Sequence, residues 1–166
     1  GVLILETAKC VERAIFLNAY FPHWLKNTCN GIECKLIHIS TDCVFSGQKG
    51  KNSENTIPDT IEEYGRTKAL GEFNVKKHLC IRTSIIGFEL KKNGEGLLHW
   101  LFNKKGDIYG YKNAFWSGVT NLELSKAIIY AIENKIDGLW NLSNGVEISK
   151  YDLIENFKNI FEFNKI

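Results

Sequence analysis

The chain has 166 residues, 44% of them hydrophobic and 24% charged, which suits a soluble globular protein with a core of its own. Its formal net charge of +2, without a basic stripe, gives no reason to expect nucleic acid, and no apolar run is as long as a membrane span. The five cysteines are an odd set without a Cys-x-x-Cys pair, and no histidine is spaced from a cysteine pair for zinc. We therefore predict free thiols, no metal site, and a cytoplasmic protein that binds neither nucleic acid nor a membrane.

The first predicted element is a helix over residues 6–30, because its apolar residues recur at helical spacing. Pro22 is expected to interrupt this helix or to start a second turn of it, and Gly31 is expected to end it. The segment KLIHIS, residues 35–40, is a short apolar run with β-branched residues, typical of a buried strand in a parallel sheet. Residues 46–59 are rich in glycine, asparagine, serine and proline, which predicts a loop.

A second helix is predicted over residues 61–78, followed by a buried strand over residues 79–86. Four isoleucines are expected in the core, namely Ile37, Ile39, Ile81 and Ile85. The later predicted elements are a helix over residues 97–103, a strand over 107–109, a helix over 121–134, a strand over 138–143 and a final helix from Ser149 to Phe161.

The alternation of strands and helices predicts an α/β fold with parallel strands. Only a few strands are visible, too few for a complete doubly wound sheet with both faces covered. We expect the chain to divide at Gly87, since the half over residues 88–166 is less regular and richer in tryptophan, tyrosine and asparagine. That composition is what a lobe covering a substrate would have.

Tyr64 and Lys68 stand four residues apart on a predicted helix, so both side chains lie on one helix face. A tyrosine has an ordinary pKa of about 10, and a nearby ammonium group lowers it by stabilising the phenolate. Tyr64 can then serve as a general acid for a carbonyl that is reduced, or as a base for an alcohol that is oxidised. Thr41 follows a predicted strand, at the end where α/β sheets bind ligands, and its hydroxyl can hold the same oxygen.

Each of these signals is weak alone, because a Tyr-x-x-x-Lys match has about an even chance of being accidental in such a chain. Their combination and order are far more specific. The stretches HISTDCVFSGQKG, YGRTKALGE and IRTSIIG resemble the extended short-chain dehydrogenase/reductases, and most closely the nucleotide-sugar branch typified by dTDP-4-dehydrorhamnose reductase. The stretches SGVTNLELSKAI and GLWNLSNGVEISKYDLIENF resemble the sugar-binding lobe of that branch.

The resemblance implies a fold and a domain arrangement. The expected fold is α/β, a partial Rossmann-like parallel sheet (its C-terminal half) with a small α+β substrate lobe. Residues 1–87 would be the catalytic half of a nucleotide-binding domain, and residues 88–166 a sugar-binding lobe interleaved with the last sheet elements.

The resemblance also implies roles for individual residues. Tyr64 would be the proton donor, Lys68 would lower its pKa and hold the nicotinamide ribose, and Thr41 would bond the reacting sugar oxygen. The implied contacts with the cofactor are Ser40, Tyr64, Lys68, Arg82, Thr83 and Ser84. The implied contacts with the sugar are Asp42, Val44, Phe45 and Asn18.

The implied reaction is hydride transfer from NADPH or NADH to the keto group of a nucleotide-linked 4-keto-deoxysugar. Two alternatives stay open, an epimerase of the same superfamily and a non-catalytic binding or regulatory module. The single Asp42 after Thr41 favours a reductase over a dehydratase, whose relatives carry an acidic pair there.

The sequence holds no glycine-rich turn for a dinucleotide pyrophosphate and no methionine. We therefore expect the natural chain to be longer and this chain alone to be inactive. The expected partners are the nucleotide-sugar substrate and either a second copy of the chain, as a homodimer, or a missing N-terminal segment.

Overall fold

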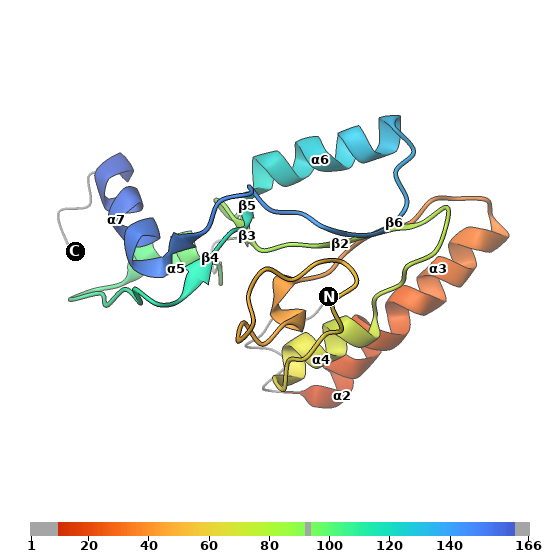
Figure 1. Ribbon diagram of the computed structural model, residues 1–166, viewed down its shortest axis with the longest axis horizontal. Helices are drawn as coiled ribbons and strands as arrows, with labels where there is room; N and C mark the ends of the chain where they lie inside the picture. Colours follow the sequence, from red (N-terminus) through yellow and green to blue (C-terminus); the bar gives the residue numbers. More distant parts are fainter. Residues whose placement is uncertain (1–9, 92–93, 162–166) are drawn as a thin grey trace. The chain divides into compact units, whose positions relative to one another are not determined.

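The computed structural model describes residues 10–91 and 94–161. These residues form two compact units whose chain segments are interleaved (Figure 1). The first unit contains residues 10–83 and 127–142, and the second contains the described residues of 84–126 and 143–161. The domain division expected at Gly87 stays a prediction, and residues 6–9, where the first helix was expected to begin, lie outside the described residues.

The first unit is built on a parallel sheet of three strands, β1 (Ile37–Ile39), β2 (Leu79–Arg82) and β6 (Gly138–Asn141), in the order β1-β2-β6. The central strand β2 is buried along its whole length and pairs in parallel with both neighbours. The expected α/β fold with a Rossmann-like parallel sheet is thus confirmed. Because parallel strands end at one edge, the residues that follow β1 and those that end β2 and β6 come together there.

Helices cover both faces of this sheet. Figure 1 shows α6 (Asn121–Glu133) over one face, and α3 (Phe21–Gly31) and α4 (Glu63–Leu70) on the other. The part of α6 in the first unit buries Ala131 against Leu79 and Ile81, and Ile37 and Ile39 pack on the same cluster. Alternation along β1 turns His38 to the opposite face, where its ring lies 5.8 Å from that of Phe73.

The first predicted helix is continuous but has three segments, α2 (Val11–Ala14), the π-helix η1 (Ile15–Tyr20) and α3. Pro22 lies in the first turn of α3, where it provides no N–H for the carbonyl of Asn18. Gly71 packs so closely on that carbonyl that a Cβ at this position would collide with it. The helix ends at Gly31, as predicted.

The second predicted helix is shorter than expected. It was expected to run to His78, whereas α4 ends at Leu70 and Gly71 follows as its cap. The contact between Gly71 and the η1 backbone fixes the chain at this point, and residues 72–78 return to the sheet without helical structure.

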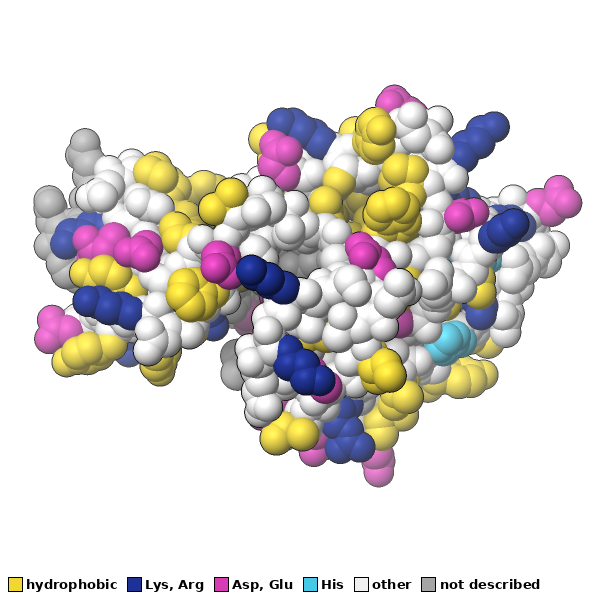
Figure 2. Space-filling model, viewed as in Figure 1, with side chains coloured by type: hydrophobic (Ala, Val, Ile, Leu, Met, Phe, Trp, Pro, Cys, Tyr) yellow, Lys and Arg dark blue, Asp and Glu magenta, His cyan; other side chains and the backbone are white. Residues whose placement is uncertain are grey.

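A row of exposed aromatic side chains runs from η1 to the start of α3. Phe16, Tyr20, Phe21 and Trp24 are exposed, with ring centroids 5.6 to 6.5 Å apart along the row. Figure 2 shows hydrophobic side chains on the outside of the molecule near these helices. The homodimer expected from the sequence stays a prediction.

The second unit contains two small sheets and two helices. Strands β3 (Ile85–Ile86) and β5 (Val119–Thr120) pair in parallel, and β4 (Phe115–Trp116) and β7 (Ile148–Ser149) are antiparallel. Helices α5 (Leu97–Asn103) and α7 (Lys150–Phe161) bury Leu98, Leu101, Leu153 and Ile154 against Ile86. Ser149 caps α7 as predicted, since its Oγ accepts from the backbone of Asp152 at 3.0 Å.

Three expectations for this region were wrong. The strand predicted over residues 79–86 divides into β2 and β3, because the carbonyl of Ser84 accepts from Val119 in the second unit. Residues 107–109 form no strand, and the pairing is made by β4 instead. Ile85, expected in the core, is 47% exposed.

Among the described residues, no helix has the length and apolar character needed to cross a membrane.

His38 gives a pH-dependent test of the packing on β1. Burial, followed by the nearby charge of Lys68, lowers the pKa of His38 to about 3, and within the described residues its Nε2 has no hydrogen-bond partner. Between that pKa and the ordinary 6.5 the unfolded chain binds more protons, so the contribution of His38 to stability is complete above pH 6.5 and is lost as the pH falls.

We expect the free energy of unfolding to decrease by up to about 1.4 kcal/mol per pH unit from this group in the range from about pH 6 to about pH 5. Burial also lowers the pKa of His78, which acts in the same direction. Denaturant unfolding at several pH values should therefore show a shallower pH dependence in His38→Leu than in the wild type. Equal slopes in the two proteins would contradict this account.

Candidate active site

The carboxyl end of β1 leads directly into the segment that was expected to carry chemistry. Thr41 follows this strand and caps the short helix η2 (Asp42–Val44), since its Oγ1 accepts from the N–H of Cys43 at 3.2 Å. The Thr41 hydroxyl also lies 3.2 Å from the Asp42 carboxylate. Thr41 is buried, so this local network fixes the direction of its hydroxyl.

Helix α4 brings Tyr64 and Lys68 to the same edge. The helix approaches η2 so closely that a Cβ at Gly65 would collide with the carbonyl oxygen of Cys43. Gly65 therefore determines how near Tyr64 comes to Thr41. The sequence interpretation did not assign this glycine, although it directly follows the tyrosine of the motif.

Tyr64 is mostly protonated at neutral pH. Burial raises the pKa of Tyr64 above its ordinary value, the nearby Cys43 and Asp42 raise it further, and a hydrogen bond with the Thr41 side chain lowers it by less. Lys68 was expected to lower the pKa of Tyr64, but it is not among the groups that shift this pKa, and burial is the largest cause. A protonated phenol is the form that donates a proton.

Lys68 lies beneath the end of β1. Its side chain is buried, and Nζ donates a hydrogen bond of 2.8 Å to the carbonyl of Ile39. Burial lowers the pKa of Lys68, while the thiol of Cys80 and the carboxylate of Glu72 oppose this shift. An ammonium group has three donors, so two remain after the bond to Ile39.

Arg82 was expected near the nicotinamide end of a cofactor, and that contact stays a prediction; in the structure Arg82 forms a buried ion pair. Its guanidinium is buried and contacts the Glu72 carboxylate, with Nη2 at 2.7 Å from Oε2 and Nε at 3.0 Å from both oxygens. The Ser40 hydroxyl donates to the same carboxylate at 2.6 Å. The Ser40–Glu72–Arg82 cluster thus joins the ends of β1 and β2. Glu72 was missed by sequence reasoning, and its signal is the Gly-Glu pair after the Tyr-x-x-x-Lys motif.

The loop over residues 46–59 is attached to this edge. The backbone N–H of Asn141 donates to the Glu54 carboxylate at 3.0 Å, and the Asn141 side chain donates to the carbonyl of Asn52 at 3.0 Å. The Asp59 carboxylate accepts from both the backbone and the hydroxyl of Ser46, which lowers the pKa of Asp59. These bonds attach the middle of the loop to the end of β6 and hold its two ends together.

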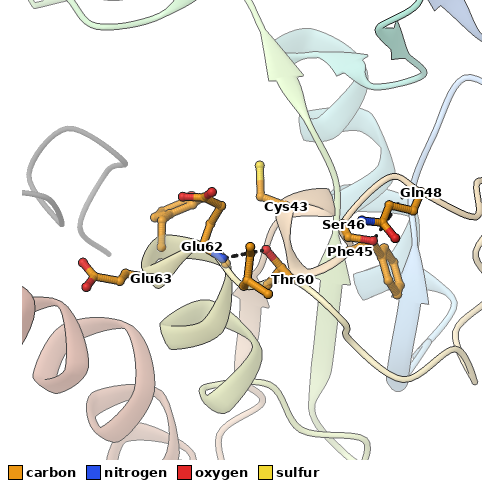
Figure 3. A pocket seen from close by; sticks show the side chains of 10 residues that line it. Cys43, Phe45, Ser46, Gln48, Thr60, Glu62 and Glu63 are labelled. Carbon is orange, nitrogen blue, oxygen red and sulfur yellow. Dashed lines mark hydrogen bonds between the residues drawn. The ribbon is translucent and has the colours of Figure 1, made fainter.

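A pocket of about 690 Å³ lies between this loop and the start of α4. Figure 3 shows Phe45, Ser46 and Gln48 on one side of it and Thr60, Glu62 and Glu63 on the other. Tyr64 and Cys43 belong to the lining, so the pocket opens next to the phenol. The Phe45 ring also lies 5.0 Å from the Arg82 guanidinium.

Four other residues were expected to contact the cofactor or the sugar, and those contacts stay predictions. Asn18 is fully buried and donates to the Thr67 hydroxyl at 3.2 Å, which ties η1 to α4. Val44 is fully buried in the core and Thr83 is also buried, so neither presents an open face. Ser84 belongs to the second unit, where its Oγ accepts from Trp116 Nε1 at 2.9 Å.

The parallel sheet, with a threonine at the end of β1 and a Tyr-x-x-x-Lys helix beside it, has the features of the extended short-chain dehydrogenase/reductases that act on nucleotide sugars. The model of one such family, described as RmlD substrate binding domain, matches residues 6–165, and the chain belongs to this family.

Known proteins agree with this assignment. Methionine adenosyltransferase 2 subunit beta of Xenopus tropicalis is 24% identical over 157 residues, which cover 86% of this chain and 46% of that protein. The structure of a hypothetical dTDP-4-dehydrorhamnose reductase from Sulfolobus tokodaii has a TM-score of 0.80 and 28% identity, over 96% of this chain and 57% of that one. The chain thus spans about half the length of these relatives.

A dTDP-4-dehydrorhamnose reductase from Bacillus anthracis, solved in complex with NADP, has a TM-score of 0.82 and 19% identity. The match covers all of this chain and 61% of that one. At this identity the likeness shows the shared fold.

Gly65 offers a test of the approach of α4 to η2. In Gly65→Ala the new methyl group meets backbone, which cannot rotate away, so we expect a loss of about 1–3 kcal/mol in the free energy of unfolding. The matched control is Gly31→Ala, at a helix end with nothing within 4 Å, where we expect a change below about 0.5 kcal/mol. Equal losses of unfolding free energy in the two variants, measured by denaturant unfolding, would show that α4 and η2 are not in close contact at Gly65.

The buried ion pair between Glu72 and Arg82 leads to a second prediction about the free energy of unfolding. Glu72→Gln leaves the guanidinium buried without its counter-charge, and we expect a loss of about 3–5 kcal/mol in unfolding free energy. The control Glu123→Gln removes a partner from the exposed pair with Lys126 and should cost below about 1 kcal/mol. The double variant Glu72→Gln/Arg82→Met should recover part of the loss, because it leaves no unpaired buried charge. A loss in Glu72→Gln no larger than in the control would contradict the assignment.

Proposed function

We propose that this chain carries the catalytic side chains of an NAD(P)H-dependent reductase that acts on a nucleotide-linked 4-keto-deoxysugar. One observation carries the proposal: Tyr64 lines an open pocket close to Thr41, and burial raises the pKa of its phenol and so keeps it protonated. The family relationship supports the substrate class, and the NADP complex of one similar structure supports the cofactor class.

Tyr64 donates its proton to the oxygen of the keto group as that oxygen gains negative charge. The Thr41 hydroxyl, held by its bonds to η2, orients the same oxygen. A bound nicotinamide supplies the hydride. After proton transfer the phenolate is stabilised by the Lys68 ammonium, which the carbonyl of Ile39 keeps at this edge of the sheet.

The residues fit a nicotinamide cofactor in part. Lys68 has donors left for the hydroxyls of a ribose, and Tyr64 is the second residue that would hold it. The expected contact of Arg82 with the cofactor fits poorly, since its guanidinium is buried and paired with Glu72. Whether the cofactor is NADPH or NADH depends on residues other than these.

The pocket also limits which part of the substrate binds beside Tyr64. Its lining carries two carboxylates, Glu62 and Glu63, and no lysine or arginine. Such a lining suits the hydroxyl groups of a sugar and disfavours the phosphates of a nucleotide. The sugar ring therefore occupies the pocket, and the diphosphate extends away from it.

A second candidate is a non-catalytic regulatory module. The relative from Xenopus tropicalis is named as a subunit of another enzyme, which supports this alternative. The tightly built Thr41 and Tyr64 arrangement favours the reductase, since a binding module needs no buried proton donor. An epimerase of the same superfamily would use these side chains as well.

Tyr64→Phe in the full-length gene product separates these functions. The variant keeps the ring and loses only the donor, so we expect turnover with NADPH or NADH to fall by about 10²–10⁴-fold with little change in the unfolding transition. Because the pKa of Tyr64 is raised, the wild-type rate of reduction should persist to at least about pH 10. The control is Tyr130→Phe, an exposed tyrosine on α6. Turnover in Tyr64→Phe within twofold of the wild type would refute the reductase proposal.

A further inference from the structure

Two cysteines close the C-terminal end of α3. The N–H of Cys34 donates to the carbonyl of Cys29 at 2.8 Å, and the N–H of Glu33 donates to the carbonyl of Asn30 at 3.4 Å. Glu33 has a left-handed backbone with a φ of 54°. This pattern of bonds is a Schellman motif, which is frequently accompanied by a contact between the side chains at the two positions that Cys29 and Cys34 occupy here.

The backbone geometry limits how far apart these cysteines stand. The hydrogen bond of 2.8 Å joins N of Cys34 to O of Cys29, and the path from each of these atoms to its own Cα is short. Standard bond lengths then place the two Cα atoms no more than about 6.7 Å apart. A disulfide joins Cα atoms separated by about 4.4–6.8 Å, so the two Cα atoms are close enough for the bond.

The two cysteines influence each other but differ in exposure. Both are free thiols, and in the reduced chain Cys34 Sγ donates to the carbonyl of Lys35 at 3.6 Å. Burial, and after it the neighbouring Cys34, raise the pKa of Cys29. Cys29 is buried and Cys34 is exposed, so a reagent in solution reaches Cys34 first.

We propose that Cys29 and Cys34 are a redox-sensitive dithiol, which closes to an intramolecular disulfide by exchange with a small-molecule disulfide such as oxidised glutathione. The Cys34 thiolate attacks one sulfur of the glutathione disulfide, which forms a mixed disulfide and releases one glutathione thiolate. The Cys29 thiolate then attacks the Cys34 sulfur and releases the second glutathione thiolate. The two protein thiols are oxidised, one glutathione disulfide is reduced, and the two protons of the protein thiols go to the solvent or to the released thiolates.

The bond would lock the junction between α3 and β1. Asn30 Oδ1 lies 2.9 Å from His78 Nε2, and the N–H of Leu36 donates to His78 Nδ1 at 3.0 Å, so this cap is already attached to the start of β2. The disulfide would add a covalent link across it without moving the strands. This proposal is independent of the reductase proposal.

The other cysteines serve as internal controls. Cys80 is buried in β2, and burial raises its pKa to about 12, which makes it a poor nucleophile. Cys10 is exposed and lies at the other end of the helical segment. A reagent that reacts by exposure alone would modify Cys10 as readily as Cys34.

Tryptic mapping of the folded chain gives a direct test. Residues 27–35, NTCNGIECK, contain both cysteines and no internal lysine or arginine, while CVER, residues 10–13, carries Cys10. The chain is equilibrated with oxidised and reduced glutathione at several ratios, quenched in acid, alkylated and digested. We expect peptide 27–35 to become about 2 Da lighter and to escape alkylation, whereas Cys10 stays alkylated or carries glutathione. In Cys29→Ser the same peptide should carry glutathione on Cys34.

The same titration in guanidinium chloride separates the folded geometry from simple nearness in sequence. We expect the equilibrium constant for closing the disulfide to be at least about 10-fold larger in the folded chain, because the Schellman motif holds the two cysteine backbones close together. Equal constants in the two states would overturn the proposal. So would a folded chain in which Cys34 accumulates as a mixed disulfide while Cys29 stays reduced.

Discussion

The buried ion pair between Arg82 and Glu72 is the interaction on which the arrangement of the site depends. A charged pair in a protein interior is stable only when every polar atom has a partner, and here Ser40 supplies the remaining bond to the carboxylate. The pair joins the end of β2 to the segment after α4, and through Ser40 to the end of β1. The residues that carry the proposed chemistry, Thr41 and Lys68, each lie one or a few positions from a member of this cluster.

A second constraint acts on Tyr64 through close backbone contact. Gly65 lets α4 approach η2, and Gly71 lets the end of the same helix approach η1. The two glycines fix both ends of a short helix that has no capping side chain at its start. The consequence is electrostatic, since the close packing buries the phenol and raises its pKa, and so keeps the proton in place for donation.

The sequence predicted those parts of the fold that depend on neighbouring residues. Local patterns were enough to predict the parallel strands, the end of α3 at Gly31, the Ser149 cap and the i,i+4 placement of Tyr64 and Lys68. The early end of α4 could not be predicted, because Gly71 stops it through a contact with a carbonyl more than 50 positions earlier in the chain.

The predictions for the candidate site were also limited by contacts between residues that are distant in the sequence. The role of Arg82 depends on Glu72, which the pattern of motifs did not connect to it, and the burial of Asn18 depends on Thr67. The family resemblance implied that Val44 faces the sugar, and the structure shows that the turn of η2 buries this side chain fully. A motif predicts which residues lie near the site in the chain. It does not predict where each side chain points, because packing with distant residues decides that direction.

The central claim is that this chain contributes the proton donor of a nucleotide-sugar reductase, and isotope transfer tests it most directly. The full-length gene product would be incubated with a nucleotide-linked 4-keto-deoxysugar and NADPH or NADH deuterated at the transferring carbon of the nicotinamide. The account predicts that the sugar product carries deuterium at the former keto carbon and that oxidised cofactor accumulates in equal amount. An unlabelled sugar, whether unchanged or converted to a stereoisomer without net oxidation of the cofactor, would contradict it.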